Sequence, residues 1–211
     1  MDANKKKVYK SKAKKVLKNL EKNNFSAAYV DTKEEALTLI KSLVDKDSKT
    51  SIGGSATLLE CGILDYLKNE TNFTDDRREA YYANWYLSSA NAITEHGEIY
   101  QVDGRSNRIS AILFGPEKVI LVVGMNKVVR TVRDAVERVK ELAAPANSIR
   151  LCKDTPCAKT GECCSPGCNP EHLMALGCDS DERICCNSLV MEKQREKGRI
   201  IVVLVGEDCG Y

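Results

Sequence analysis

The order of apolar and polar positions along the chain predicts alternating strands and helices. Two apolar runs rich in β-branched residues, 119–123 and 199–205, are typical of strands buried on both faces of a parallel sheet. Thr32, with Glu35 three residues later, is a helix-start signature before apolar positions at helical spacing. Further strands are expected at 27–30, 51–52, 85–89, 91–94 and 98–102, and further helices at 58–67, 75–83, 107–114 and 131–142. This alternation predicts an α/β fold with a mostly parallel sheet covered on both faces.

Two segments depart from the alternation. Residues 1–22 hold nine lysines, yet apolar side chains recur there at roughly helical spacing. These apolar positions are Val8, Ala13, Val16, Leu17 and Leu20. We interpret the segment as a basic amphipathic helix docked on the body with its lysines outward. Residues 152–197 hold most of the cysteines and are interpreted as a loop-rich insertion before the last strand. We expect one domain over residues 1–211.

Composition and charge exclude several classes of protein. The chain is 43% hydrophobic and 29% charged, as is ordinary for a globular protein, and its net charge of +2 favours neither nucleic acid nor an acidic membrane surface. Its polar opening has no apolar signal-peptide core, and no stretch approaches the ~20 apolar residues of a membrane span. A soluble, cytoplasmic protein is expected, and the oligomeric state, including a homo-oligomer, stays open.

The segment Gly53-Gly54-Ser55, between a strand end and a helix, is a candidate anion site. Glycines let the backbone approach a ligand closely, and a helix N-terminus offers free N–H groups to an anion. The hydroxyl groups of Ser55 and Thr57 add donors. The alternative is a tight turn in which Ser55 caps the helix.

Polar residues that follow later apolar segments are candidates for ligand contact. Asn91 and Asn126 lie beside apolar strands, where buried amides need partners. Lys127 follows a strand end and is either an anion-neutralising group or a surface residue. Asn107 and Arg108 open a predicted helix, so a helix cap and a structural ion pair are the alternatives to ligand binding.

Two carboxylates are candidates for acid–base catalysis. Glu95 lies at a predicted turn and Asp103 at a strand end, where a carboxylate can point into a cleft. Either could serve as a general base if burial raised its pKa. The alternative is that both are ordinary turn residues. His96, next to Glu95, is an outside candidate.

The chain has ten cysteines, of which eight lie between Cys152 and Cys186. Because the rest of the chain can build its own core, clustered thiols in a cytosolic protein indicate metal or redox chemistry rather than a disulfide framework. Four thiolates can hold zinc or an iron–sulfur cluster, and the spacing here does not choose between them. Free thiols or disulfides are the alternative.

Several short motifs follow one another along the chain in a family-specific order. They are Gly53-Gly54-Ser55-Ala56-Thr57, Ser88-Ser89-Ala90-Asn91, Asp103-Gly104 with Asn107-Arg108, Phe114-Gly115-Pro116, Gly124 with Asn126-Lys127, and Val205-Gly206-Glu207-Asp208. Over about residues 10–211 this set resembles the LUD-domain (lactate-utilisation) family. The resemblance implies a Rossmann-like fold similar to the ribose-5-phosphate isomerase, glucosamine-6-phosphate deaminase and CoA-transferase superfamily, with ligands at the C-terminal strand ends.

The resemblance also implies functional expectations. In that superfamily the loop matching Gly53–Thr57 holds phosphate or an acyl-CoA group, and a central carboxylate, here Glu95 or Asp103, often performs the chemistry. Family members known for lactate utilisation act in a complex whose iron–sulfur partner subunits oxidise L-lactate to pyruvate. We therefore expect a component of such a complex that binds a small anionic metabolite. The alternatives are a transferase or isomerase and a non-catalytic metal or redox sensor.

A subgroup of the family carries a C-terminal cysteine segment similar to the one here. By this resemblance the metal ligands are expected to be Cys157, Cys163, Cys178 and Cys185. In the subgroup the second and third cysteines are close together, whereas residues 164–177 separate them here. Cys168 or Cys164 is therefore an alternative third ligand, and His172 is a further candidate.

Overall fold

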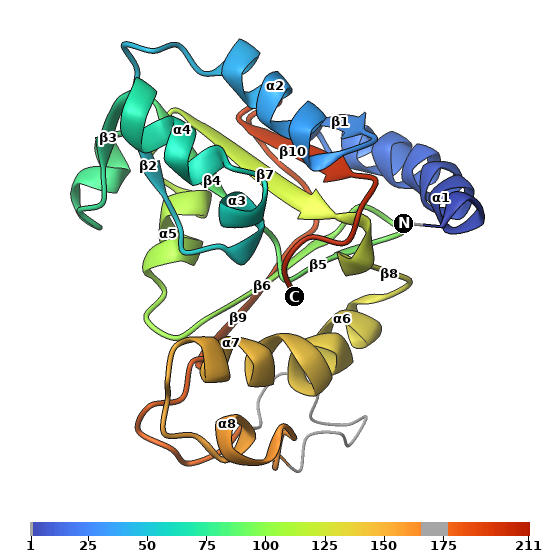
Figure 1. The fold of residues 1–211 in the computed structure, drawn as a ribbon, viewed down its shortest axis with the longest axis vertical. Helices are drawn as coiled ribbons and strands as arrows, with labels where there is room; N and C mark the ends of the chain where they lie inside the picture. The colour runs from blue at the N-terminus through green and yellow to red at the C-terminus, as the bar shows by residue number, and fades with distance from the viewer. Residues whose placement is uncertain (1, 166–176) are drawn as a thin grey trace.

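The computed structural model describes residues 2–165 and 177–211, and it is built around a six-stranded parallel sheet (Figure 1). The strands, in spatial order, are β1 (Ser26–Val30), β10 (Ile200–Val205), β7 (Lys118–Gly124), β4 (Trp85–Ser88), β2 (Lys49–Ile52) and β3 (Asn72–Thr74). All neighbours in this sheet pair in parallel. The Rossmann-like α/β fold expected from the sequence is therefore confirmed.

Helices cover both faces of this sheet, as the apolar runs predict. Along β7 the side chains of Val119 and Leu121 belong to one buried cluster and those of Ile120 and Val122 to another, because successive strand residues face opposite sides. The first cluster includes α1 (Ala3–Lys22) and α5 (Asn107–Leu113). The second includes α2 (Lys33–Leu43), α3 (Ala56–Glu60) and α4 (Ile63–Glu70).

A second, mixed sheet lies beside the first. Its order is β8 (Val128–Val129), β5 (Ala92–Thr94), β6 (Ile99–Asp103) and β9 (Asn187–Met191). Strand β6 pairs antiparallel with both β5 and β9. Within residues 152–197, the segment expected to be a loop-rich insertion, the structure also has the helix α8 (Pro156–Thr160) and strand β9, which were not predicted from the sequence.

A long helical stretch packs on this second sheet, on the side away from the main sheet (Figure 1). It consists of α6 (Val132–Arg138), a π-helical turn η3 (Val139–Ala143) and α7 (Ala144–Arg150). We expected a helix that ends at Leu142. The helical path continues past Leu142 because the π-helical turn η3 directly precedes α7, so that Pro145 lies in the first turn of a new α-helix, where a proline is tolerated.

Three other local expectations need correction. The helix expected over 58–67 is two helices, α3 and α4, separated by Gly62 at φ 67°, a left-handed conformation that interrupts a helix. The helix expected over 75–83 is only the 3₁₀ turn η1 (Glu79–Tyr82). In α1, Ala13, Val16 and Leu20 are buried as predicted, but Val8 is 52% exposed.

Within residues 2–165 and 177–211, no helix combines the length and the apolar character needed to cross a bilayer.

Candidate functional site

A cleft of about 430 Å³ opens at the C-terminal ends of the main-sheet strands. Its lining includes Gly54 after β2, Ser89 after β4, Lys127 after β7 and Asp103 at the end of β6. The carboxyl ends of parallel strands meet at one edge of a sheet, and this edge is where open α/β sheets bind ligands. We call this space the cationic cleft, for the charges described below.

The two glycines of the predicted anion loop have different roles. A Cβ atom at Gly53 would lie 2.5 Å from Arg108 Cγ and 2.8 Å from Ser88 Oγ, so this glycine is required for packing. A Cβ atom at Gly54 would meet no atom within 4 Å, and Gly54 lines the cleft. The Ser55 hydroxyl caps α3 by accepting from the Leu58 N–H at 3.3 Å. The backbone of Gly54 is therefore the part of the loop that a ligand can approach.

Lys127 lies at the bottom of the cleft. Its side chain is 3% exposed, and Nζ donates to Thr57 Oγ1 at 2.8 Å and to Ser89 Oγ at 3.3 Å. Burial, and then the neighbouring charge of Arg138, lower the pKa of Lys127 to about 7. In the described residues no carboxylate lies within 4.0 Å of this amine. Near neutral pH the amine can therefore neutralise an anion or accept a proton.

Arg108 is held by neutral acceptors. Its guanidinium donates to Asn91 Oδ1 at 3.0 Å, to the Val102 carbonyl at 2.7 Å and to Gln101 Oε1. Asn91 Oδ1 also accepts from the Val102 N–H at 2.8 Å. Burial lowers the pKa of Arg108. Asn91 therefore orients the arginine, and the positive charge stays at the cleft wall without a direct ion pair to a described carboxylate.

Asp103 lines the cleft, and both its oxygens already have partners. One oxygen accepts from the Arg105 N–H at 3.0 Å, and the other accepts from the N–H groups of Arg108 at 2.9 Å and Ile109 at 3.2 Å. The carboxylate thus satisfies free N–H groups at the start of α5. Asn107, also in the cleft lining, is the first residue of α5 rather than its cap.

The structure does not bring Glu95 to this cleft. Its carboxylate pairs with Lys15 of α1 at 2.8 Å, and its carbonyl accepts from Asn19 Nδ2 at 2.7 Å. The hydrogen bond from Lys15 lowers the pKa of Glu95, the opposite of what a general base near neutral pH needs. The neighbouring His96 carbonyl accepts from Asn23 at 3.1 Å. This turn therefore contacts the N-terminal helix.

Gly124 and Asn126 contact the C-terminal segment. Asn126 Nδ2 donates to the Gly210 carbonyl at 2.9 Å, and its Oδ1 accepts from the Cys209 N–H at 3.1 Å. A Cβ atom at Gly124 would lie 2.6 Å from the Cys209 nitrogen. These two residues thus hold the segment whose last residue, Tyr211, lines the cleft.

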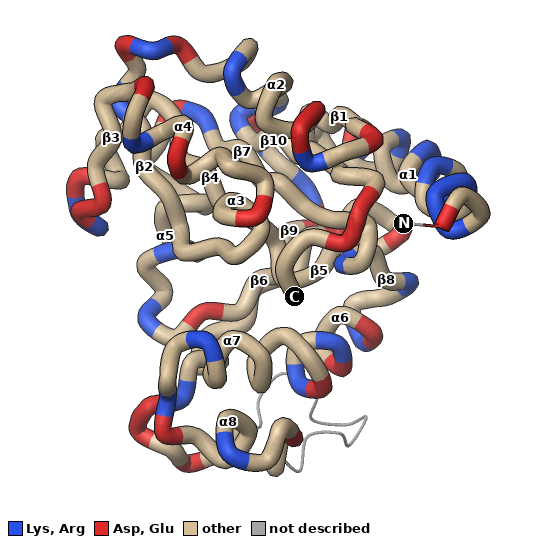
Figure 2. Tube along the Cα trace, viewed as in Figure 1, with Lys and Arg blue, Asp and Glu red and all other residues tan. Residues whose placement is uncertain are grey.

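The charge of the cleft lining is strongly one-sided. Among the described residues, six cations line it, and Asp103 is the one acidic side chain. The cations are Arg77, Arg105, Arg108, Lys127, Arg150 and Lys153. Of these, in the described part of the chain, only Lys153 has an ion-pair partner, Glu182 at 3.0 Å. Figure 2 shows the basic positions before α5 and at the end of α7. Arg77, Arg105, Arg150 and Lys153 were missed by sequence reasoning because they come from separate segments without a shared motif.

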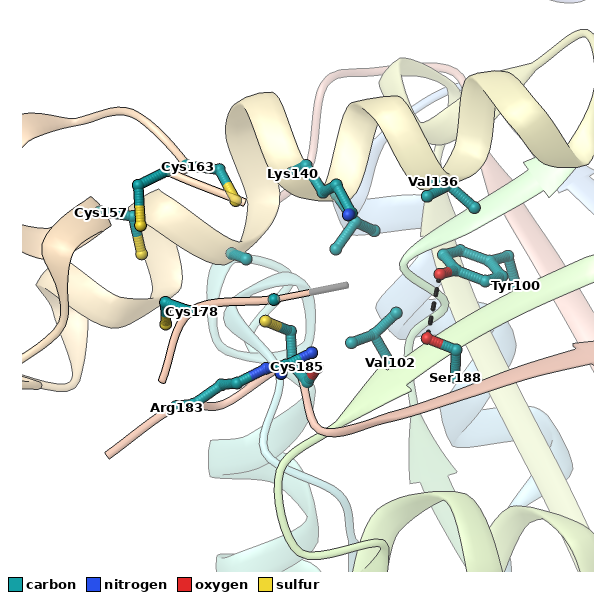
Figure 3. A pocket seen from close by; sticks show the side chains of 14 residues that line it. Tyr100, Val102, Val136, Lys140, Cys157, Cys163, Cys178, Arg183, Cys185 and Ser188 are labelled. Carbon is teal, nitrogen blue, oxygen red and sulfur yellow. Dashed lines mark hydrogen bonds between the residues drawn. The ribbon is translucent and has the colours of Figure 1, made fainter. Parts of the chain in front are cut away.

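The four expected metal ligands all line a second, smaller cavity of about 30 Å³ (Figure 3). Cys157 lies in α8, and Cys163, Cys178 and Cys185 lie in the loops between α8 and β9. Cys164 lines the same space, which we call the thiol cavity. Two of the other candidates, Cys168 and His172, lie outside the described residues.

The donors of the thiol cavity suit a soft metal ion, but they are not gathered into a ligand set. The nine described cysteines are free, and within residues 2–165 and 177–211 no group of three or more His, Cys, Asp or Glu is arranged to hold a metal. Cys157 Sγ lies 3.3 Å from Thr155 Oγ1. Burial raises the pKa of the Cys163 thiol. Lys140 and Arg183 also line the cavity and would offset the charge of thiolates.

The cleft and the thiol cavity share a wall. Val102 of β6 lines both, and Ile184 lines the cleft while the next residue, Cys185, lines the thiol cavity. The helical stretch contributes Ala143 to the cleft and Ala144 to the thiol cavity.

Comparison with known proteins identifies the family. The family model for the LUD domain matches residues 13–205. The chain belongs to the LUD domain family. This LUD domain is also similar to the crystal structure of a DUF162 family protein from Deinococcus radiodurans, with a TM-score of 0.52 and 16% sequence identity. The match covers 93% of this chain and 97% of the other, and at this identity it supports the fold alone. No curated protein matches the sequence.

Proposed function

We propose that this LUD domain binds a small organic-acid anion in the cationic cleft and acts in lactate-type redox metabolism. The domain would be a component of an iron–sulfur complex that oxidises L-lactate to pyruvate. The association of the family with lactate utilisation supports this proposal. The observation that carries it is the charge of the cleft: among the residues that the structure describes, six cations face one acidic side chain whose oxygens are already hydrogen-bonded. Such a site attracts an anion and disfavours a cation.

The residues suggest how an acid would be held. Its carboxylate would lie near Lys127 Nζ and the Ser89 hydroxyl, with the exposed Gly54 backbone beside it. Oxidation of a 2-hydroxy acid to a 2-oxo acid removes two electrons and two protons. The iron–sulfur partner subunits would accept both electrons and both protons would pass to water, while the protonated amine of Lys127 holds the carboxylate.

The thiol cavity is proposed as a metal site that holds either zinc or an iron–sulfur cluster. Support comes from the gathering of Cys157, Cys163, Cys178 and Cys185 around one space. When bound, zinc would brace the loops and a cluster would carry electrons. Metal, iron and sulfide analysis of protein purified without oxygen distinguishes these cases, and protein free of metal would contradict the proposal.

The test of the proposed function has two readouts. Tagged protein isolated anaerobically from its native cells should retain iron–sulfur subunits, and the isolated complex should reduce an electron-acceptor dye when L-lactate is added. Isothermal titration calorimetry of the purified domain should detect binding of L-lactate or pyruvate. A domain that binds neither acid and retains no iron–sulfur partner would contradict the proposal.

A transferase or isomerase that binds a phosphate or CoA group is the second candidate function. The open space over Gly54 and the cleft volume of about 430 Å³, which exceeds the needs of a three-carbon acid, favour it. Thermal stabilisation by acyl-CoA or sugar phosphates, without any effect of L-lactate, would support this candidate. Stability that depends on metal alone would instead favour a non-catalytic sensor.

A further inference from the structure

We infer that the ligand of the cationic cleft carries two separate anionic groups, one at the buried lysine and one at the arginine rim. The inner position is formed by Lys127 with Ser89, and the rim by Arg77, Arg105 and Arg150. This inference rests on the proposed anion-binding function of the cleft and narrows its substrate class to hydroxy acids with a second carboxylate or phosphate.

The inner position has fixed geometry. Lys127 Nζ is held by two hydroxyl groups, Thr57 Oγ1 at 2.8 Å and Ser89 Oγ at 3.3 Å. The lysine is 3% exposed, so a group bound there is largely removed from water. One carboxylate fills this position because it offers two oxygens to one amine and one hydroxyl.

The rim arginines lie in three segments that are distant in the sequence. Arg77 precedes η1, Arg105 lies between β6 and α5, and Arg150 ends α7. Asn147 Oδ1 accepts from two nitrogens of Arg150, at 3.1 and 2.7 Å, which orients this guanidinium. All three side chains reach the same cleft.

The charge of the rim has no internal counter-ion in the described part of the chain. Ten ion pairs there involve many surface lysines, but none involves Arg77, Arg105 or Arg150. Lys153 also lines the cleft, but its amine pairs with the Glu182 carboxylate at 3.0 Å. It therefore attracts an anionic ligand less strongly than the rim arginines do. Three uncompensated guanidinium groups match a carboxylate or phosphate, which can accept two parallel N–H bonds from one arginine.

The size of the cleft supports a ligand that reaches both positions. About 430 Å³ is within the range of sites for ligands much larger than a three-carbon acid. A monocarboxylate would engage the buried lysine and leave the rim charges unmatched.

Calorimetric titration with a set of matched acids tests the inference. L-Lactate carries one anionic group, L-malate and L-2-hydroxyglutarate add a second carboxylate at two lengths, and 3-phosphoglycerate adds a phosphate. Inorganic phosphate is the control for a single anion at the rim. The acids with two groups should bind at least about tenfold more tightly than L-lactate at low salt, and the difference should shrink as salt is added. Preference for 3-phosphoglycerate over both dicarboxylates would identify the second group as a phosphate.

Because the rim arginines are exposed, each can be replaced with little expected effect on folding, so that the variants test ligand binding. Arg105→Gln and Arg150→Gln should each weaken the acids with two groups by about fivefold and leave L-lactate unchanged. Arg77→Gln should act in the same way, whereas Arg78→Gln, its neighbour outside the cleft lining, should change nothing. Circular dichroism before titration confirms that each variant is folded.

The results distinguish a ligand with two anionic groups from the more general proposal that the cleft binds an anion. Equal affinity for L-lactate and the acids with two groups, or rim variants that weaken every acid equally, would overturn the inference and leave the anion-binding cleft intact. Failure of all five probes to bind would overturn both.

Discussion

The two cavities of this LUD domain lie back to back and differ in almost every physical property. The cationic cleft has about 430 Å³, opens at the sheet edge and is lined by six cations. The thiol cavity has about 30 Å³ and is lined by five cysteines and several apolar side chains. The first has the size and charge for an anionic metabolite, whereas the second is a small space surrounded by thiols that could ligate a soft metal. One fold thus offers ligand binding and thiol chemistry on the two sides of a single wall.

Neighbouring residues of the chain form the two sides of this wall. Ile184 contacts one cavity and Cys185 the other, and Val102 contacts both. A Cβ atom at Gly104 would lie 3.2 Å from Ile184 Cα, so β6 and this segment are in close contact. The cysteine segment is therefore part of the cleft wall rather than an appendage, because its residues Lys153 and Ile184 line the cleft.

The largest expected effect is on the thiol side. Joint replacement Cys157→Ser and Cys185→Ser should release any bound metal and loosen residues 152–186, because a serine hydroxyl is a poor ligand for a soft metal. Metal analysis and hydrogen exchange measure the two effects. The control is Cys152→Ser, because Cys152 is not among the described residues that line the thiol cavity. Full metal retention in the double variant would show that other residues are the ligands.

On the cleft side, Lys127→Met should weaken binding of an organic acid by about 100-fold, because a buried charged hydrogen bond to the carboxylate is lost. Calorimetry measures the affinity, and metal content should not change. An affinity equal to that of the unmodified protein would place the anion elsewhere and remove the contrast between the two cavities.

The two loop glycines, Gly53 and Gly54, should respond differently to substitution, one in protein stability and the other in ligand binding. Gly53→Ala should lower the free energy of unfolding by about 1–3 kcal/mol, since its Cβ would lie 2.5 Å from Arg108 Cγ. Gly54→Val should leave stability nearly unchanged but abolish ligand binding, because the side chain would enter the open space over the loop. Denaturant unfolding and calorimetry separate the two effects. Unchanged ligand binding in Gly54→Val would remove the loop from the binding site.

The smallest expected effect is a pH dependence confined to the cleft. The pKa of Lys127 is about 7 in the folded chain, against 10.5 ordinarily, because of burial and then Arg138. An anion needs the protonated amine, so affinity should fall by about fivefold between pH 7 and pH 8. The unfolded chain binds this proton more tightly, so stability should instead rise as pH increases from 7 toward 10.5. In Lys127→Met both dependences should disappear. Affinity that is independent of pH would contradict a role for this lysine.

Much of the fold was predictable because its signals are local. Continuous apolar runs marked β7 and β10, Thr32 marked the start of α2, and the spacing of Ala13, Val16 and Leu20 marked the docked face of α1. The Thr32 cap is confirmed by its bond from the Glu35 N–H at 3.2 Å, although the Glu35 carboxylate accepts from Asp31 rather than from Thr32.

The candidate site was predictable only in part. Gly54 and Lys127 follow strands that end at the cleft, and the four thiols expected from the family resemblance line one cavity, but the rim arginines meet only through tertiary packing. Strand β9 was missed because Asn187–Met191 has two exposed residues and gains its order from pairing with β6. Glu95 lies at the expected turn but does not reach the cleft, because this turn packs on α1, a contact that no local pattern encodes.

Lys127 is proposed to neutralise an anion in the cleft, and the titration of its amine tests this role most directly. Protein labelled with ¹³C at the lysine ε-carbons would be titrated by NMR with and without saturating L-lactate, and Lys127→Met would assign the signal. We expect a midpoint near pH 7 that moves to higher pH when the acid binds. A midpoint in the ordinary range of a lysine, or one that L-lactate does not move, would contradict it.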